Sequence, residues 1–145
     1  MQYDALKITT QQAEDILFKL FNIKGKASEL PGEVDFNFRI KVENEEGYIL
    51  KISRPGEDEN CLDFQQKLLQ HIATNGSNLI APKVIHDTNG SPISSIKGAS
   101  GKKRNVRLLS WVSGRVLSDV NPQLDSLRFS LGEQCGLLTQ ALQGF

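Results

Sequence analysis

The sequence lacks an excess of either charge, because 17 lysines and arginines are matched by 17 aspartates and glutamates. This balance argues against a protein that binds nucleic acid or a membrane surface by bulk electrostatics. The chain also lacks a long apolar run and a basic amino-terminal stretch, so we expect neither a signal peptide nor a membrane-spanning helix. We therefore expect a cytoplasmic protein with no nucleic-acid or membrane partner.

Cysteine is scarce as well, with only Cys61 and Cys135 in the chain. They lie on separate predicted helices, and although they could in principle pair, we expect buried reduced thiols. Neither cysteine forms a metal-ligand spacing with His71 or His86. The 145 residues have the apolar and charged fractions of a soluble globular protein, so we expect one domain with a real core.

Local patterns predict the order helix, strands, helix, strands, helix, which is an α+β fold with a mainly antiparallel sheet. Thr9 and Gln12 resemble a capping box that opens the first helix. Residues 43–47 form a polar hairpin turn, and Asn89-Gly90 is a second hairpin signal. The helices are expected at about 9–22, 61–74 and from 122 onward, the strands at 36–42, 48–52, 82–86 and 107–112, with a short strand-like piece at 25–32 and a loop at 97–105.

The most informative segment is the apolar strand at residues 48–52, because it contains Lys51. A lysine in a half-buried strand is costly unless its ammonium has an anionic partner. Alternation places Ile49 on the same face as Lys51, and this pairing suits a nucleotide pocket, in which an aliphatic side chain covers the base and the ammonium reaches the phosphates. The competing interpretation is an edge-strand lysine that points to solvent.

Several short segments, taken in order, carry a family resemblance over roughly residues 28–145. They are LPGEVDFNFR at 30–39, YILKI at 48–52, LDFQQKLL at 62–69, APKV at 81–84, VRLLSWVSG at 106–114 and LGE at 131–133. The ordered set resembles the amino-terminal lobe of the protein-kinase-like fold, and more closely the aminoglycoside phosphotransferase and choline kinase group. Within that group it is most similar to hydroxylysine-kinase-like members, some of which are fused to aminotransferases.

The resemblance implies a twisted antiparallel sheet of about five strands, with a helix packed after the third. It also implies one domain over residues 1–145, divided into three parts. These are an amino-terminal helix and lead-in at 1–27, the kinase-like lobe at 28–114, and a hinge with the first helix toward a second lobe at 115–145.

The resemblance assigns nucleotide-binding roles to three segments. Lys51 would neutralise the α- and β-phosphates, and Ile49 would cover the adenine. The loop from Gly32 through Glu33 to Asn37 would cover the phosphates with its backbone N–H groups, although the chain has no G-x-G-x-x-G motif there. An ordinary Pro-Gly turn between two strands is the alternative for this loop.

The third segment is the strand end that leads into the adenine hinge. The resemblance implies that backbone groups of Ser110, Trp111 and Val112 would bind the edge of the base. Backbone groups are common to all residues, so these side chains carry little information. Trp111 is more often a packing residue than a platform for stacking a base.

The expected partner of Lys51 departs from the family pattern. Kinase-like lobes place a glutamate on the helix after the lysine strand, and the matching position here is Gln65. Its amide would hold the ammonium by a hydrogen bond without supplying a countercharge, and a polar residue at the edge of an apolar stripe is the alternative. Asp63 is the second candidate partner, although its spacing from Lys67 predicts a solvated ion pair.

The chain contains no H-x-D-x-x-x-x-N segment and no later metal-binding aspartate segment. The family uses both for phosphoryl transfer, with the Mg²⁺ ligands in the second lobe. We therefore expect the ATP-binding lobe of a small-molecule phosphotransferase, a fragment that acts on the hydroxyl of an amino-alcohol, amino acid or similar metabolite only together with its catalytic lobe.

Two alternatives remain open at this point. One is a non-catalytic kinase-like scaffold or regulatory module of a larger protein, possibly fused to an aminotransferase, which Gln65 favours. The other is an unrelated α+β binding domain. A lobe without its partner would also expose apolar surface, and it would then be prone to self-association.

Overall fold

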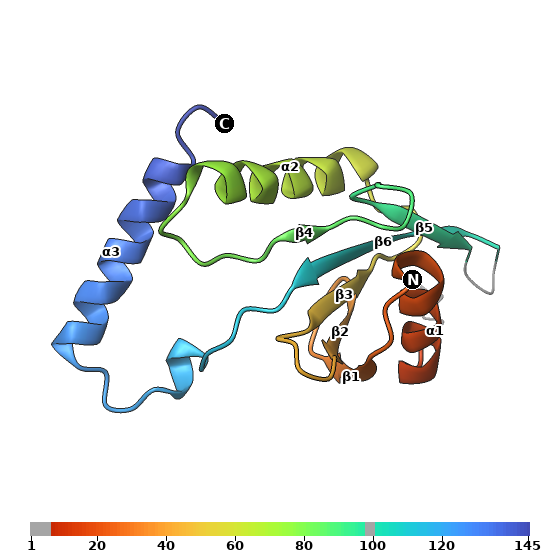
Figure 1. Cartoon of the computed structure of the whole chain (residues 1–145), viewed down its shortest axis with the longest axis horizontal. Helices are drawn as coiled ribbons and strands as arrows, with labels where there is room; N and C mark the ends of the chain where they lie inside the picture. Colours follow the sequence, from red (N-terminus) through yellow and green to blue (C-terminus); the bar gives the residue numbers. More distant parts are fainter. Residues whose placement is uncertain (1–6, 98–100) are drawn as a thin grey trace.

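The computed structural model describes residues 7–97 and 101–145, and its central feature is one antiparallel sheet (Figure 1). The strand order is β1-β2-β3-β6-β4, and β5 also pairs with β6. The strands are β1 (Lys26–Leu30), β2 (Phe36–Lys41), β3 (Tyr48–Ile52), β4 (Val84–Ile85), β5 (Ser94–Lys97) and β6 (Lys103–Ser110). The predicted α+β class and antiparallel sheet are confirmed.

The β2–β3 hairpin sets the register on which the site depends. Its turn needs residues with positive φ, supplied by Asn44 at 62° and Gly47 at 83°. A Cβ on Gly47 would lie 2.2 Å from the carbonyl oxygen of Ile40, so only glycine fits there. The resulting register places Asn37 opposite Lys51.

Helix α1 (Thr10–Phe21) covers one face of the sheet and builds the core. Its capping box closes as predicted, with Thr9 and Gln12 each bonding the other's backbone N–H. Ala13 and Leu17 are fully buried in one cluster with side chains of β2, β3 and β6, including Leu50. Burying a leucine side chain of this kind contributes about 1.5–3 kcal/mol, so the packing of α1 on this face stabilises the sheet.

Helix α2 (Glu59–Asn75) lies on the opposite face, and Asp58 caps its first turn (Figure 1). Its rotation differs from the predicted one. Leu62 and Gln66 turn inward, and the Gln66 Nε2 donates to the Pro92 carbonyl oxygen at 2.8 Å. Cys61 is exposed instead of buried. An apolar stripe alone does not fix the rotation of a helix about its own axis. Here the hydrogen bond from Gln66 to the Pro92 carbonyl oxygen helps to fix it.

Three further sequence predictions need correction. Both cysteines are free, but Cys135 is exposed like Cys61. Strand β6 begins at Lys103 instead of 107, because its charged first half pairs with β5 over residues 103–106. Asn89-Gly90 forms a tight turn, yet β4 and β5 both pair with β6 and not with each other. Residues 98–100 of the predicted 97–105 loop lie outside the described residues.

The carboxyl-terminal segment contains a short 3₁₀ helix (Leu117–Asp119) and α3 (Asp125–Ala141). Figure 1 shows α3 extending away from the sheet, in contact with α2 only near one end. Only Ala141 of α3 is buried. None of the helices in the described ranges has the length and apolarity needed to cross a bilayer.

Candidate functional site

The sheet register brings three polar side chains into one row on the face below α2. Asn37 of β2 lies opposite Lys51 of β3, and Lys51 lies opposite Arg107 of β6. The Lys51 ammonium donates to the Asn37 Oδ1 at 2.8 Å. Because side chains alternate along a strand, this row points away from the core under α1. The row therefore gathers two positive charges at the centre of one sheet face.

Asp35 is the countercharge for both cations. Its Oδ2 lies 3.4 Å from the Lys51 Nζ and 3.0 Å from the Arg107 Nη2. The exposed side-chain fractions are 12% for Asp35, 25% for Lys51 and 4% for Arg107, so the pair with Arg107 is largely shielded from water. Two cations against one carboxylate leave one positive charge uncompensated, and the more exposed Lys51 presents it.

The loop that carries Asp35 is held by specific contacts. The Arg54 guanidinium donates to the carbonyl oxygens of Val34 and Glu33 at 2.9 and 3.1 Å. A Cβ on Gly32 would lie 2.5 Å from the Asp35 carbonyl oxygen and 2.4 Å from the Asn37 Nδ2. Glycine at position 32 is thus required by packing. The phosphate-covering role of this loop stays a prediction.

The helix residues expected to hold Lys51 do not do so. The Gln65 Oε1 accepts a hydrogen bond from the Arg107 Nη1 at 2.7 Å, and Gln65 has no bond to Lys51 among the described residues. Asp63 pairs with Lys67 at 2.6 Å with both side chains substantially exposed, as the spacing predicts. The reason is the helix rotation, which brings the 65 side chain over β6 and not over β3.

An aliphatic patch adjoins the polar row on the same face. Ile49 lies opposite Leu109, and Val84 lies on the other side of Leu109. At its margin the Arg39 guanidinium lies over the Trp111 ring, 3.6 Å from the ring centre. Burial lowers the pKa of Arg39 from its ordinary value. Such an aliphatic patch can cover one face of a flat apolar ring.

In the predicted hinge segment, two of the three backbone N–H groups already form hydrogen bonds within the fold. The Ser110 N–H donates to the Lys83 carbonyl oxygen at 2.9 Å, and the Trp111 N–H donates to Gly47 at 3.0 Å. In the described part of the chain, Val112 is the first residue of the segment whose N–H has no such bond, and its side chain is 38% exposed. Of the three predicted hinge residues, Val112 thus retains a backbone donor for a ligand.

Sequence reasoning missed Asp35, Arg107 and Arg39. An arginine between apolar residues in a strand, as at 107, carries the same signal as Lys51, because its charge needs a partner. The acid of Asp35-Phe36-Asn37 lies two residues before the predicted Asn37, but only the folded loop shows that it turns toward β3. The cluster can bind an anion with several negative charges. Over the described ranges, no group of three or more His, Cys, Asp or Glu is placed to hold a metal ion.

Comparison with known proteins gives one family match and several solved structures, two of which are described below. The family model described as "Phosphotransferase enzyme family" matches residues 26–145. An amicoumacin kinase, solved in complex with AMP-PNP, Ca²⁺ and Ami, superposes with a TM-score of 0.72 at 18% identity, covering 93% of this chain and 40% of that one. A microcompartment-associated aminopropanol kinase gives 0.69 at 16% identity, covering 94% and 42%.

The chain thus spans about two fifths of the length of these two structures. At these identities the likeness shows a shared fold, the kinase-like amino-terminal lobe. No curated protein matches the chain.

Proposed function

The chain belongs to the phosphotransferase enzyme family, and from this premise we propose that it is the nucleotide-binding part of a small-molecule kinase. The reaction would move a phosphoryl group from ATP to a hydroxyl of an amino-alcohol, amino acid or similar metabolite. The observation that carries this proposal is the cluster of Lys51, Arg107 and Asp35, which places two cations and one carboxylate on the sheet face below α2.

The cluster fits the phosphates of a nucleotide by its charge. Lys51 and Arg107 carry one positive charge more than Asp35 neutralises, and Lys51 is the member nearest to solvent. Asp35 and Asn37 fix the ammonium, so little side-chain entropy would remain to be lost on binding. Arg107, held by Asp35 and Gln65, would act by keeping the carboxylate in position and by adding to the positive field.

The aliphatic patch next to the cluster would receive the base. Ile49 and Leu109 would cover one face of the adenine, while the backbone of Val112 would bond its edge. The pair of Arg39 and Trp111 would border the base at the end of the β2–β3 hairpin. This assignment keeps the predicted roles of Lys51, Ile49 and Val112 and moves Gln65 from a partner of Lys51 to a partner of Arg107.

Magnesium would neutralise developing charge on the transferred phosphoryl group. We propose that its ligands and the acceptor-orienting aspartate come from a second lobe of the same protein, since the described residues here offer no acidic cluster. The carboxyl-terminal segment supports this arrangement. It exposes large apolar side chains at Val116, Leu124, Phe129 and Leu131, of which Phe129 is 72% exposed. A second lobe would cover them, and without it they favour self-association.

The alternative, a non-catalytic scaffold, rested on the lack of a countercharge at Gln65. Asp35 supplies that countercharge from the loop, so this feature no longer favours the scaffold. The hydroxylysine-kinase-like relationship and the aminotransferase fusion remain predictions, and the acceptor is open within the class named above.

The test is a calorimetric titration of the protein containing this chain with AMP-PNP and Mg²⁺. Lys51→Met should weaken binding by about tenfold to a hundredfold, the worth of one charge-assisted hydrogen bond. Lys67→Met is the matched control, because that lysine also pairs with an aspartate but lies in solvent. Equal nucleotide affinity in the Lys51→Met protein and its parent would overturn the proposal. A phosphorylation assay with amino-alcohols then separates a kinase from a scaffold that only binds nucleotide.

A further inference from the structure

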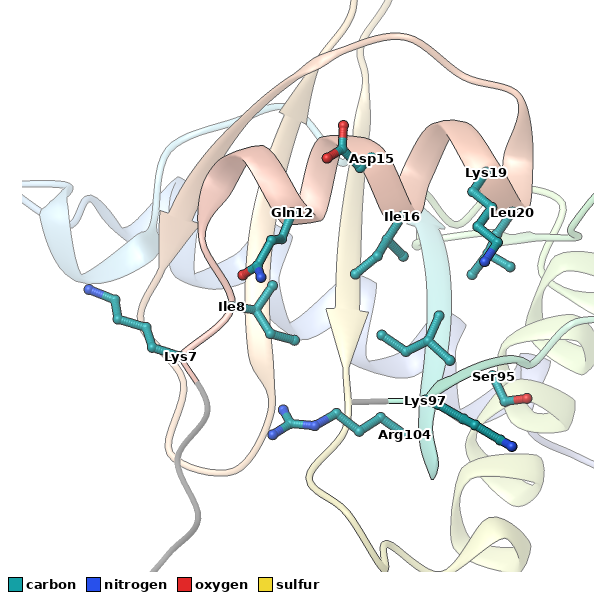
Figure 2. A pocket seen from close by; sticks show the side chains of 11 residues that line it. Lys7, Ile8, Gln12, Asp15, Ile16, Lys19, Leu20, Ser95, Lys97 and Arg104 are labelled. Carbon is teal, nitrogen blue, oxygen red and sulfur yellow. The ribbon is translucent and has the colours of Figure 1, made fainter. Parts of the chain in front are cut away.

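A cavity lies on the face of the sheet opposite to Lys51, between α1 and the β5–β6 hairpin (Figure 2). Its volume is about 550 Å³, and four aliphatic side chains form much of its wall: Ile8, Ile16, Leu20 and Ile96. A cavity of this size takes a small organic molecule. Because the sheet separates it from the nucleotide site, what it binds is independent of the function proposed above.

Arg104 is the unusual member of this wall. It is only 2% exposed, and among the described residues its Nη1 has no hydrogen-bond partner and its guanidinium no carboxylate partner. The guanidinium lies over the Phe36 ring, with 5.4 Å between the guanidinium carbon and the ring centre. Figure 2 shows the side chain reaching from β6 toward Ile8. A buried guanidinium without an anion carries a large desolvation cost, so this position calls for a negative charge.

The charges around the cavity have the same sign as Arg104. Lys7, Lys19 and Lys97 also line it, and Asp15 is the one acid among its described lining residues. Lys7 has an outside partner, because its ammonium lies 3.7 Å from Glu29. Even with Lys7 set aside, the described wall carries three cations and one carboxylate, which is an excess of two positive charges.

We propose that this cavity is a second binding site, and that it takes a small organic anion. A carboxylate or phosphate head would pair with Arg104, and a short aliphatic body would lie between Ile16 and Ile96. The combination of a buried unpaired guanidinium with aliphatic walls distinguishes this ligand class from an inorganic ion, which would leave the apolar walls unused, and from a neutral lipid, which would leave the charge unpaired.

The first test needs no variant. The full chain is titrated calorimetrically with hexanoate, hexyl phosphate, hexanamide and hexylamine at low salt. Hexanoate or hexyl phosphate should bind at least about tenfold more tightly than hexanamide, because only they offer a charge to the guanidinium. The stronger of the two identifies the head group. Equal affinities for hexanoate and hexanamide, or tighter binding of hexylamine, would overturn the proposal.

Variants then locate the site. Arg104→Gln should weaken binding of the preferred probe by about tenfold or more. Lys67→Gln removes one exposed positive charge on α2 and should leave binding unchanged. If the Arg104→Gln chain melts like the parent and binds the probe as well, the site is elsewhere and the proposal fails.

A last arm asks whether the chain supplies its own anion. Asp4 precedes Lys7 in sequence and belongs to the residues outside the described ranges. The Asp4→Asn chain is titrated with the same probe. Affinity equal to that of the parent supports a site for an external anion, whereas binding that appears only in Asp4→Asn would overturn it in favour of an internal carboxylate.

Discussion

Strand β6 carries two buried arginines three residues apart, and they face opposite sides of the sheet. Arg107 is 4% exposed and is held by Asp35 at 3.0 Å and Gln65 at 2.7 Å. Arg104 is 2% exposed and has no such partner among the described residues. A guanidinium with its partners is part of the fold, whereas one without them marks a place for a ligand. The two faces of this strand therefore have different chemistry despite similar burial.

The largest expected effect comes from removing the partner on the Arg107 side. Asp35→Asn leaves Arg107 and Lys51 without a countercharge and should lower the free energy of unfolding by about 3–5 kcal/mol. Urea unfolding followed by circular dichroism measures it. Adding Arg107→Met to Asp35→Asn should recover part of the loss, since the buried unpaired charge is gone. A double variant no more stable than the single one would contradict this account of the cluster.

Replacing each arginine by methionine sharpens the comparison. Arg107→Met should destabilise the protein by about 1–3 kcal/mol, because Gln65 and Asp35 lose their donor. Arg104→Met should be neutral or stabilising by about 1–4 kcal/mol, because it removes an unpaired charge and keeps the side-chain volume. Chemical unfolding of both variants without added ligand tests the difference in sign. Equal losses in the two variants would show that Arg104 has a partner after all.

A smaller effect on stability is expected at Asp87, which lies in the loop between β4 and β5. Burial opposes ionisation of Asp87, but hydrogen bonds from Ser91, Ser94 and Asn89 lower the pKa of Asp87 below its ordinary 3.8. A carboxylate with a depressed pKa stabilises the fold above its unfolded pKa, and this stability is lost as the pH falls through the folded pKa.

Asp87→Asn should thus cost about 1 kcal/mol at pH 7, roughly the worth of one net hydrogen bond. The difference in stability between the two proteins should narrow as the pH falls below the ordinary 3.8 of an aspartate and through the lower folded pKa of Asp87. Melting temperatures of both proteins from pH 7 to pH 2 measure this. A gap that stays constant across this range would exclude the carboxylate as its source.

The smallest effect on stability is expected at the ion pair of Lys67 with Asp63, which is the solvent-exposed counterpart of the Lys51–Asp35 pair. Lys67 and Asp63 pair at 2.6 Å on α2, but both side chains are substantially exposed. Lys67→Ala should change the free energy of unfolding by about 0.3–0.5 kcal/mol, and high salt should reduce even that. A loss as large as that of Asp35→Asn would mean that geometry, and not burial, sets the strength of these pairs.

The sequence predicted the elements more reliably than the contacts. Period-two alternation at 36–42 and the capping box at Thr9 are local signals, and both elements form where expected. The partner of Lys51 was not predictable in this way. It depends on the rotation of α2 and on the path of the loop through Asp35, and both are set by packing between segments far apart in the chain. The first half of β6 was missed because its charges resemble those of a loop.

The stack of Arg39 on Trp111 has a practical consequence, because Trp111 is the only tryptophan of the chain. A cation held against an indole ring alters its emission, and this ring borders the face below α2, across the sheet from the Arg104 cavity. Tryptophan fluorescence should therefore change when a ligand binds to the face below α2. It should stay unchanged when a ligand binds in the Arg104 cavity. The protein thus carries a built-in optical reporter that tells its two surfaces apart.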